Sequence, residues 1–422
     1  MYESSSIREP TQEDKASRRH KLVLNDAGKT FNENLSHYEN MKVIVLGCGN
    51  IGSVAAEDLA RSMRATEIIV ADYDEARAEG VAKRIGASNL SWIKTDVTKH
   101  DELIDTLRGF DLAMGFLPGN LGYRLAEACI DAHKDLVDVS YMPEDPLPLN
   151  KAAVHSGSTI VPDCGLAPGI SNVLVGHSVS KLDRVESVHV MVGGIPEKPV
   201  PPLDYVITWS TESLIDEYTR KAGIIKKGQK VEVEALSGVE EIEFPNVGRL
   251  EAFYTDGLRT LLHTLKDVDD MWEKTLRYPG HAEKVRLLRA LGFFSETKVK
   301  VEGANIQPRK LTARILEQKL STKTPNDIVA LRSETCGVED SERTTYLYDL
   351  LDFHDKERGL TAMARTTAYP ASIVAQLILK GDLKEKGVVP PEKLGMDSKL
   401  FKLFLEGLKN RGININEKKT AT

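Results

Sequence analysis

The sequence lacks the patterns of membrane, secreted and nucleic-acid-binding proteins. Nowhere in its 422 residues does an apolar run approach the length of about 18 residues that a transmembrane helix needs. The N-terminus has no apolar core of the kind that a signal peptide carries. The formal net charge of −7 argues against nucleic acid or a membrane surface as the main partner.

Cysteine is also scarce. The four cysteines are far apart and form no C-x-x-C pair: Cys48, Cys129, Cys164 and Cys336. This spacing supports neither a disulfide framework nor a zinc site, so we expect no bound metal. It is typical of reduced thiols in a cytoplasm. The sequence therefore predicts a cytoplasmic protein whose partner is a small molecule.

The segment from Met41 to Asp72 carries the most informative motif. A short apolar run leads into Gly47, Gly49 and Gly52, and an amphipathic helix and a second apolar run follow. The first glycine permits a tight turn, the second lets the backbone approach a pyrophosphate, and the third lets the helix pack on the strand. Because strand, helix and a terminal acid all stand at the required places, the motif predicts a dinucleotide-binding site.

The charge around Asp72 indicates which dinucleotide binds. Its carboxylate can accept hydrogen bonds from both hydroxyls of an adenosine ribose, and it would repel a 2′-phosphate. The next residues offer no cation, and Arg77 is interpreted as a solvated helix residue. We therefore expect NAD rather than NADP. The predicted cofactor-binding residues are Gly47, Gly49, Asn50, Ile51, Gly52, Asp72, Tyr73, Asp96, Leu117 and Pro118.

The length predicts two or three domains, and an apolar fraction of 41% is ample for their cores. Residues 1–40 are polar and without periodicity, which is typical of a tail. From Met41 onward apolar runs alternate with helical patterns, which predicts an α/β domain with a doubly wound parallel Rossmann sheet. Its expected strands are 42–46, 67–71, 90–93, 110–114, 136–139 and 158–162, and its expected helices are 51–62, 75–85, 101–108, 121–133 and 146–156.

The pattern changes after Gly169 and predicts an inserted α+β second domain. Its expected strands are 185–192, 205–209, 230–235 and 250–254, its expected helices are 257–266 and 281–292, and a charged, β-rich stretch is expected at 297–357. A helix with Pro370 in its first turn is expected at 370–380. The expected domains are 41–168 plus about 360–395 for the Rossmann domain, 169–359 for the inserted domain, and 396–422 for a C-terminal helix and tail.

Several motifs resemble, in order, those of the saccharopine dehydrogenase family. They are GFLP (115–118), DVSYM (138–142), PDCGLAPGISN (162–172), LRYPGHAEK (276–284) and ARTTAYPASIVAQLILKG (364–381). The resemblance covers about residues 41–395. It implies a dinucleotide-binding domain, an inserted domain that contacts substrate, and a homodimer.

Within that family, the segments at 192–205, 250–257 and 363–371 are most similar to the lysine 6-dehydrogenase branch. That similarity implies oxidative deamination of the side-chain amine of L-lysine with NAD. Ala167 stands in a GLAPG loop where saccharopine-forming relatives carry Asp.

Residues at the ends of the expected strands are candidates for catalysis. An ammonium must lose a proton before hydride can leave its carbon, so an acid, a histidine or a tyrosine is expected beside it. The candidate catalytic residues are Asp138, Tyr141, Asp163 and His281. Ordinary roles stay open for each of them, in turns for the two acids and in packing for Tyr141 and His281.

The second domain is expected to hold the substrate. A free amino acid needs a cation for its carboxylate, and the guanidinium of Arg277 offers bidentate geometry. The candidate substrate-binding residues are Arg277, Tyr278, Asp256 and Trp209. A surface ion pair remains the alternative for Arg277, and a core position remains the alternative for Trp209.

The leading hypothesis is NAD-dependent oxidation of L-lysine to allysine, which cyclises to a piperideine carboxylate, with release of ammonia. A saccharopine dehydrogenase-type reaction, which joins or splits an amino acid and a carbonyl compound, is the second hypothesis. A protein that binds NAD without turnover is the third. All three stay open at the level of the sequence.

Overall fold

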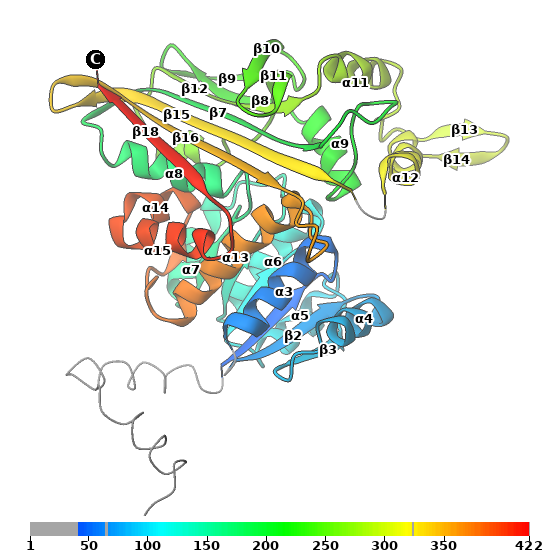
Figure 1. Cartoon of the computed structure of the whole chain (residues 1–422). Coiled ribbons are helices and arrows are strands. Elements are labelled where there is room, and N and C mark those ends of the chain that lie inside the picture. The colour runs from blue at the N-terminus through cyan, green and yellow to red at the C-terminus, as the bar shows by residue number, and fades with distance from the viewer. Residues whose placement is uncertain (1–40, 64–65, 323–324, 422) are drawn as a thin grey trace, which may run out of the picture. The chain divides into compact units, whose positions relative to one another are not determined.

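The computed structural model describes residues 41–63, 66–322 and 325–421 (Figure 1). The tail predicted at 1–40 lies outside the described residues. Within them the chain builds two large sheets and a small hairpin. No helix in these ranges is both long and apolar enough to cross a membrane.

The first sheet is parallel throughout, with the order β17-β6-β5-β4-β1-β2-β3. Its strands are β1 (Lys42–Leu46), β2 (Glu67–Asp72), β3 (Leu90–Lys94), β4 (Leu112–Gly115), β5 (Asp135–Asp138), β6 (Thr159–Val161) and β17 (Gly387–Val388). Its helices are α3 (Asn50–Ser62), α4 (Glu75–Ile85), α5 (His100–Leu107), α6 (Gly119–Asp131) and α7 (Asn150–Ser156), with a 3₁₀ turn η1 (Leu147–Leu149) before α7.

Helices cover both faces of this sheet because successive side chains of each strand point to opposite sides. Val43 and Val45 of β1 pack in a cluster with α3 and α4, whereas Ile44 and Leu46 pack in a cluster with α5, α6 and α7. This arrangement confirms the predicted doubly wound Rossmann fold. The strand order reverses at β1, between β2 and β4, and ligands of such sheets bind at the carboxyl ends of the strands there.

The second sheet has the order β10-β11-β12-β7-β15-β16-β18, with β8 and β9 attached beside β12. Its strands are β7 (Arg184–Pro196), β8 (Ala222–Lys226), β9 (Gln229–Val233), β10 (Glu240–Phe244), β11 (Gly248–Tyr254), β12 (Asp270–Arg277), β15 (Asp327–Glu339), β16 (Glu342–Phe353) and β18 (Ile415–Ala421). The pairing of β7 with β12 is parallel, and the other pairings are antiparallel. The sheet is therefore mixed.

Helices and a hairpin complete the second domain. The helices are α8 (Ile170–Val179), α9 (Thr211–Thr219), α10 (Leu261–Thr264), α11 (His281–Ala290) and α12 (Pro308–Leu320). The hairpin of β13 (Val299–Val301) and β14 (Ala304–Ile306) extends away from the second sheet beside α12 (Figure 1).

The helix α13 (Ala362–Leu379) joins the two sheets. It begins where the Thr361 hydroxyl accepts the Ala364 N–H at 3.0 Å, and nearly all of its side chains are buried. They share one apolar cluster with Val43 of the first sheet and Leu331 of the second. Two further helices follow, α14 (Pro391–Met396) and α15 (Ser398–Lys409). The two sheets therefore share part of one hydrophobic core.

One expectation for the second domain is wrong, and another is confirmed but incomplete. Residues 205–209 form no strand. Their apolar side chains are buried, but the chain is irregular, and the Ile207 N–H donates to the Leu320 carbonyl at 3.0 Å. The stretch at 297–357 is β-rich but also contains α12.

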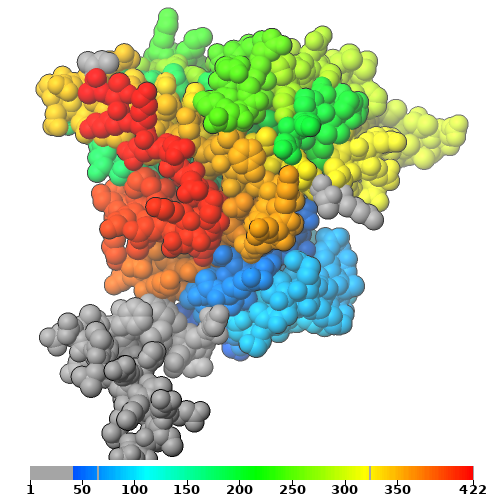
Figure 2. Space-filling view, in the orientation of Figure 1, coloured from blue at the N-terminus to red at the C-terminus, as the bar shows by residue number. Residues whose placement is uncertain are grey.

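Two expectations near the C-terminus also need correction. The helix expected at 370–380 begins at Ala362, so Pro370 lies inside α13 rather than in its first turn. The tail expected after α15 is strand β18, which pairs antiparallel with β16 from Leu350↔Ile415 to Thr344↔Ala421. Figure 2 shows this C-terminal segment (red) on the surface, and its exposed lysines are typical of an edge strand.

Candidate active site

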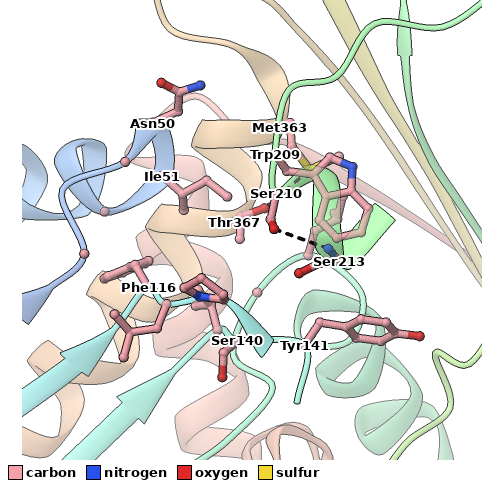
Figure 3. Close-up of a pocket in the computed structure, with 18 of the residues that line it drawn as sticks. Asn50, Ile51, Phe116, Ser140, Tyr141, Trp209, Ser210, Ser213, Met363 and Thr367 are labelled. Carbon is pink, nitrogen blue, oxygen red and sulfur yellow. Dashed lines mark hydrogen bonds between the residues drawn. The ribbon is translucent and has the colours of Figure 1, made fainter. Parts of the chain in front are cut away.

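A cavity of about 810 Å³ extends from the glycine turn after β1 to the face of the second sheet. Asn50, Ile51 and Phe116 of the first domain lie on one side of it, and Trp209 of the second domain lies on the other side together with Tyr141 of the first (Figure 3). Met363 and Thr367 of α13 line it between them. The cavity therefore brings together residues of both domains.

The glycine turn has the geometry that a dinucleotide requires. Gly47 has φ +102°, and a side chain there would overlap the Phe116 carbonyl. A side chain at Gly52 would overlap the Gly47 carbonyl, whereas Gly49 has open space where its Cβ would stand. Helix α3 begins directly after Gly49 and has no side-chain cap on its first N–H groups. These N–H groups are available to a phosphate.

Asp72 lies at the carboxyl end of β2 and is 7% exposed. Its carboxylate accepts the Cys48 N–H at 2.9 Å and the Asp74 N–H at 3.0 Å, which fixes it at the edge of the cavity. Arg77 also lines the cavity and lies 3.9 Å from the Asp74 carboxylate.

Most of the predicted cofactor-binding residues line the cavity. They are Gly47, Gly49, Asn50, Ile51, Gly52, Asp72, Tyr73, Leu117 and Pro118. Asp96 does not line it. The Asp96 carboxylate accepts hydrogen bonds from the Thr98 hydroxyl and N–H, which lower its pKa. Asp96 thus stabilises the turn in which it lies.

Tyr141 lines the cavity from the loop after β5, but its hydroxyl is engaged. It donates to the Asp256 carbonyl at 2.7 Å, and the Arg220 guanidinium lies 4.2 Å from the ring centroid. Burial raises the pKa of Tyr141 well above its ordinary value. The residue joins the first domain to the second through this contact.

Asp138 and Asp163 are buried and do not line the cavity. Asp138 accepts the Ser140 N–H at 2.9 Å and the Ser140 hydroxyl, and burial raises its pKa to about 7. Asp163 lies 3.3 Å from the Arg259 guanidinium. Burial raises the pKa of Asp163 as well, against the lowering effect of Arg259. Both side chains support loops that border the cavity.

His281 lies in the interior of the second domain, where it makes two hydrogen bonds. Its Nε2 is 2.8 Å from the Tyr218 hydroxyl and its Nδ1 is 2.8 Å from the Leu203 carbonyl. Burial, followed by Arg277, lowers its pKa to about 3, so the ring is neutral. His281 and Tyr278 do not line the cavity, and the Tyr278 hydroxyl donates to the Pro196 carbonyl at 2.9 Å.

Arg277, Asp256 and Trp209 do line the cavity. Arg277 is only 3% exposed, and its Nη2 lies 3.0 Å from the Glu217 carboxylate. Its Nε is buried without a hydrogen-bond partner. The structure therefore presents Arg277 as half of a buried ion pair that borders the cavity.

Sequence reasoning missed the acids that share this wall with Asp256. Glu217 of α9 and Glu273 of β12 line the cavity, and the Thr275 hydroxyl donates to Glu217 at 2.7 Å. Glu273, Thr275 and Arg277 alternate along β12 and so lie on one face of the strand. That two-residue spacing is the sequence signal that could have found Glu273 beside Arg277.

A doubly wound sheet whose dinucleotide turn opens onto the polar wall of a second domain is typical of dinucleotide-dependent oxidoreductases. Comparison with known proteins specifies the family. The model "Saccharopine dehydrogenase NADP binding domain" matches residues 43–161, and "Saccharopine dehydrogenase C-terminal domain" matches residues 165–413, more than half of the chain. The chain belongs to the saccharopine dehydrogenase family.

Curated relatives of several activities are similar to the chain. Carboxyaminopropylagmatine dehydrogenase of Synechocystis is 24% identical, covering 87% of this chain and 96% of that protein. The NADP-dependent, L-glutamate-forming saccharopine dehydrogenase of Saccharomyces cerevisiae is 22% identical over 90% and 99%. The solved apo structure of that yeast enzyme has a TM-score of 0.73 at 21% identity, covers 90% of this chain, and shows the likeness of fold.

Proposed function

We propose that the protein oxidises the side-chain amine of L-lysine, giving allysine and ammonia, with NAD as the hydride acceptor. The observation that carries this proposal is the charge of the cavity. Its second-domain wall holds Glu217, Asp256, Glu273 and Glu317, whereas the cations among its described lining residues are Arg77, beside the dinucleotide turn, and Arg277. A wall with this balance favours a cationic substrate.

An amino acid with a second amine complements the charges of this wall at both of its ends. The Arg277–Glu217 pair offers one charge of each sign, which complements an α-carboxylate and an α-ammonium. Asp256 and Glu273 then face the side-chain ammonium, and Trp209 and Tyr141 supply apolar surface for the methylenes. A bound nicotinamide would accept hydride from the amine-bearing carbon.

NAD is the proposed cofactor because of Asp72. A buried carboxylate at the edge of the cavity can accept ribose hydroxyls and repels a 2′-phosphate. The descriptions of the matching domain and of the yeast relative name NADP. Comparison of the two nucleotides is therefore part of the test.

The names of the relatives favour a second candidate, oxidative splitting of a secondary amine of the saccharopine type. Saccharopine carries three carboxylates, and the guanidinium groups near the wall are already paired, that of Arg277 with Glu217 and those of Arg220 and Arg259 with Asp256. The charge balance thus ranks lysine ahead of saccharopine. The family resemblance further predicts a homodimer, which sedimentation can test.

The test is a turnover assay with purified protein. We expect L-lysine with NAD to produce NADH absorbance and a product that reacts with o-aminobenzaldehyde, with NADP a poorer acceptor. Turnover of saccharopine but not lysine would replace the first candidate with the second. Nucleotide binding without turnover of any amine would show a binding protein.

A further inference from the structure

Glu273 is a buried carboxyl group that faces the cavity and has no hydrogen-bond or ion-pair partner among the residues that the structure describes. It lies in the middle of β12, is 4% exposed, and lines the cavity. No residue in the described part of the chain donates a hydrogen bond to its carboxyl group or pairs with it. Gly257 gives it room, because a side chain at that position would overlap the Glu273 carboxyl group.

Each neighbouring acid of the wall is paired with a guanidinium group. Glu217 lies 3.0 Å from the Arg277 guanidinium. Asp256 lies 3.4 Å from the Arg220 guanidinium and 3.6 Å from the Arg259 guanidinium. Glu273 is thus the acid of this wall whose charge is not balanced within the described residues, and a ligand can balance it.

The surroundings of Glu273 favour proton uptake. Burial, followed by the nearby Glu217 and Asp256 carboxylates, raises the pKa of Glu273 well above its ordinary value, and Arg259 opposes this shift. A carboxylate with a raised pKa takes a proton from an ammonium at lower cost than an ordinary one. The raised pKa supports the assignment that the geometry suggests.

We propose that Glu273 accepts the proton of the reacting ammonium, an assignment that rests on the proposed function. The substrate R–CH₂–NH₃⁺ gives one N–H proton to the Glu273 carboxylate, which leaves R–CH₂–NH₂ and a neutral carboxyl group. The amine lone pair can then form the C=N bond as hydride leaves the carbon for bound NAD. Water adds to the resulting iminium R–CH=NH₂⁺, and departure of ammonia with one proton, as NH₄⁺, leaves the aldehyde R–CHO.

The other candidates are less suited to this step. The Tyr141 hydroxyl already donates its proton to the Asp256 carbonyl. Asp138, Asp163 and His281 do not line the cavity. Glu273 is therefore the titratable group that combines access to the cavity with an uncommitted carboxyl group.

The first test compares Glu273→Gln and Glu273→Asp with Glu243→Gln, an exposed acid of the same sheet that lies away from the cavity. For Glu273→Gln we expect kcat to fall by about 10²- to 10⁴-fold, the usual contribution of a general base. Unfolding temperature and NAD affinity should stay near wild type. Glu273→Asp should recover part of the activity, and Glu243→Gln should match wild type.

The pH profile separates proton transfer from binding. Wild-type kcat should rise with pH as Glu273 ionises. In Glu273→Gln that rise should vanish, and kcat should rise only near the pKa of the lysine side chain itself, about 10.4. A raised KM with unchanged kcat, or an unchanged pH profile, would overturn the proposal, as would full activity in Glu273→Gln. If Glu273→Gln fails to fold, a wild-type profile in Glu273→Asp would overturn it.

A binding measurement without nucleotide makes the outcome independent of turnover. Calorimetry of L-lysine and of 1,5-diaminopentane, in buffers with different ionisation enthalpies, should show release of about one proton where free Glu273 is protonated. Glu273→Gln should release none. If the wild-type protein releases a proton when it binds the amine but does not oxidise lysine, the proposed function fails and Glu273 remains the amine site. Equal proton release in both proteins would contradict the role of Glu273.

Discussion

Asp138 and Glu273 are both buried carboxyl groups with a raised pKa, and their neighbours separate their roles. Asp138 accepts two hydrogen bonds from Ser140, and its other oxygen is buried without a partner. Glu273 instead faces the cavity, where a cationic ligand can reach it. We therefore assign Asp138 to the support of the loop after β5 and Glu273 to the substrate.

Asp138→Asn should change how stability depends on pH. The pKa of Asp138 is about 7 in the folded protein and near 3.8 when exposed, so its ionisation costs the folded state stability as pH rises between these values. The free energy of unfolding of wild type should fall across that interval, and in Asp138→Asn this fall should be smaller. Urea unfolding at a series of pH values measures it. Parallel curves for the two proteins would contradict the assignment.

At the scale of elements, the sequence predicted what short-range patterns specify. The glycine turn, Asp72 and, apart from β17, the strands and helices of the first domain follow from local periodicity, and the structure has them within a few residues. The strand β12 was not predicted, because its pairing with β7 depends on contacts far apart in the sequence. As a result, local sequence patterns indicate Arg277 as a site residue but not the nearby Glu273.

The position of Glu273 on β12 depends on the close approach of the turn at Gly257. Gly257→Ala should displace the Glu273 carboxyl group, because the new methyl group would occupy its place. We expect kcat for lysine to fall at least about tenfold while NAD affinity is kept. Gly80→Ala in α4 is the matched control, because its Cβ meets open space. Equal activity of the two variants in the same assay would show that Gly257 does not position Glu273.

At the scale of the whole described molecule, charged residues link the two domains across the cavity. Arg259 of the second domain contacts Asp163, which follows β6 of the first, and the Tyr141 hydroxyl contacts the Asp256 carbonyl. Arg220 donates to the Met142 carbonyl at 3.3 Å. Together with α13, these contacts fix the acid wall relative to the dinucleotide turn.

Arg259→Met should destabilise the protein by about 3–5 kcal/mol, because it leaves Asp163 buried without its cation. Asp163→Asn in the same chain should recover much of that loss, since no uncompensated charge remains. Denaturant unfolding of the two single variants and the double variant gives the coupling energy. Additive losses would mean that the pair does not act as a unit.

The most direct test of the account is a crystal structure with NAD and L-lysine bound under conditions that prevent turnover. We predict the nicotinamide at the carboxyl ends of β4 and β5, the lysine side-chain carbon against its ring, and the ammonium within hydrogen-bond distance of Glu273. A lysine bound with its carboxylate toward Glu273, or outside the cavity, would contradict the account.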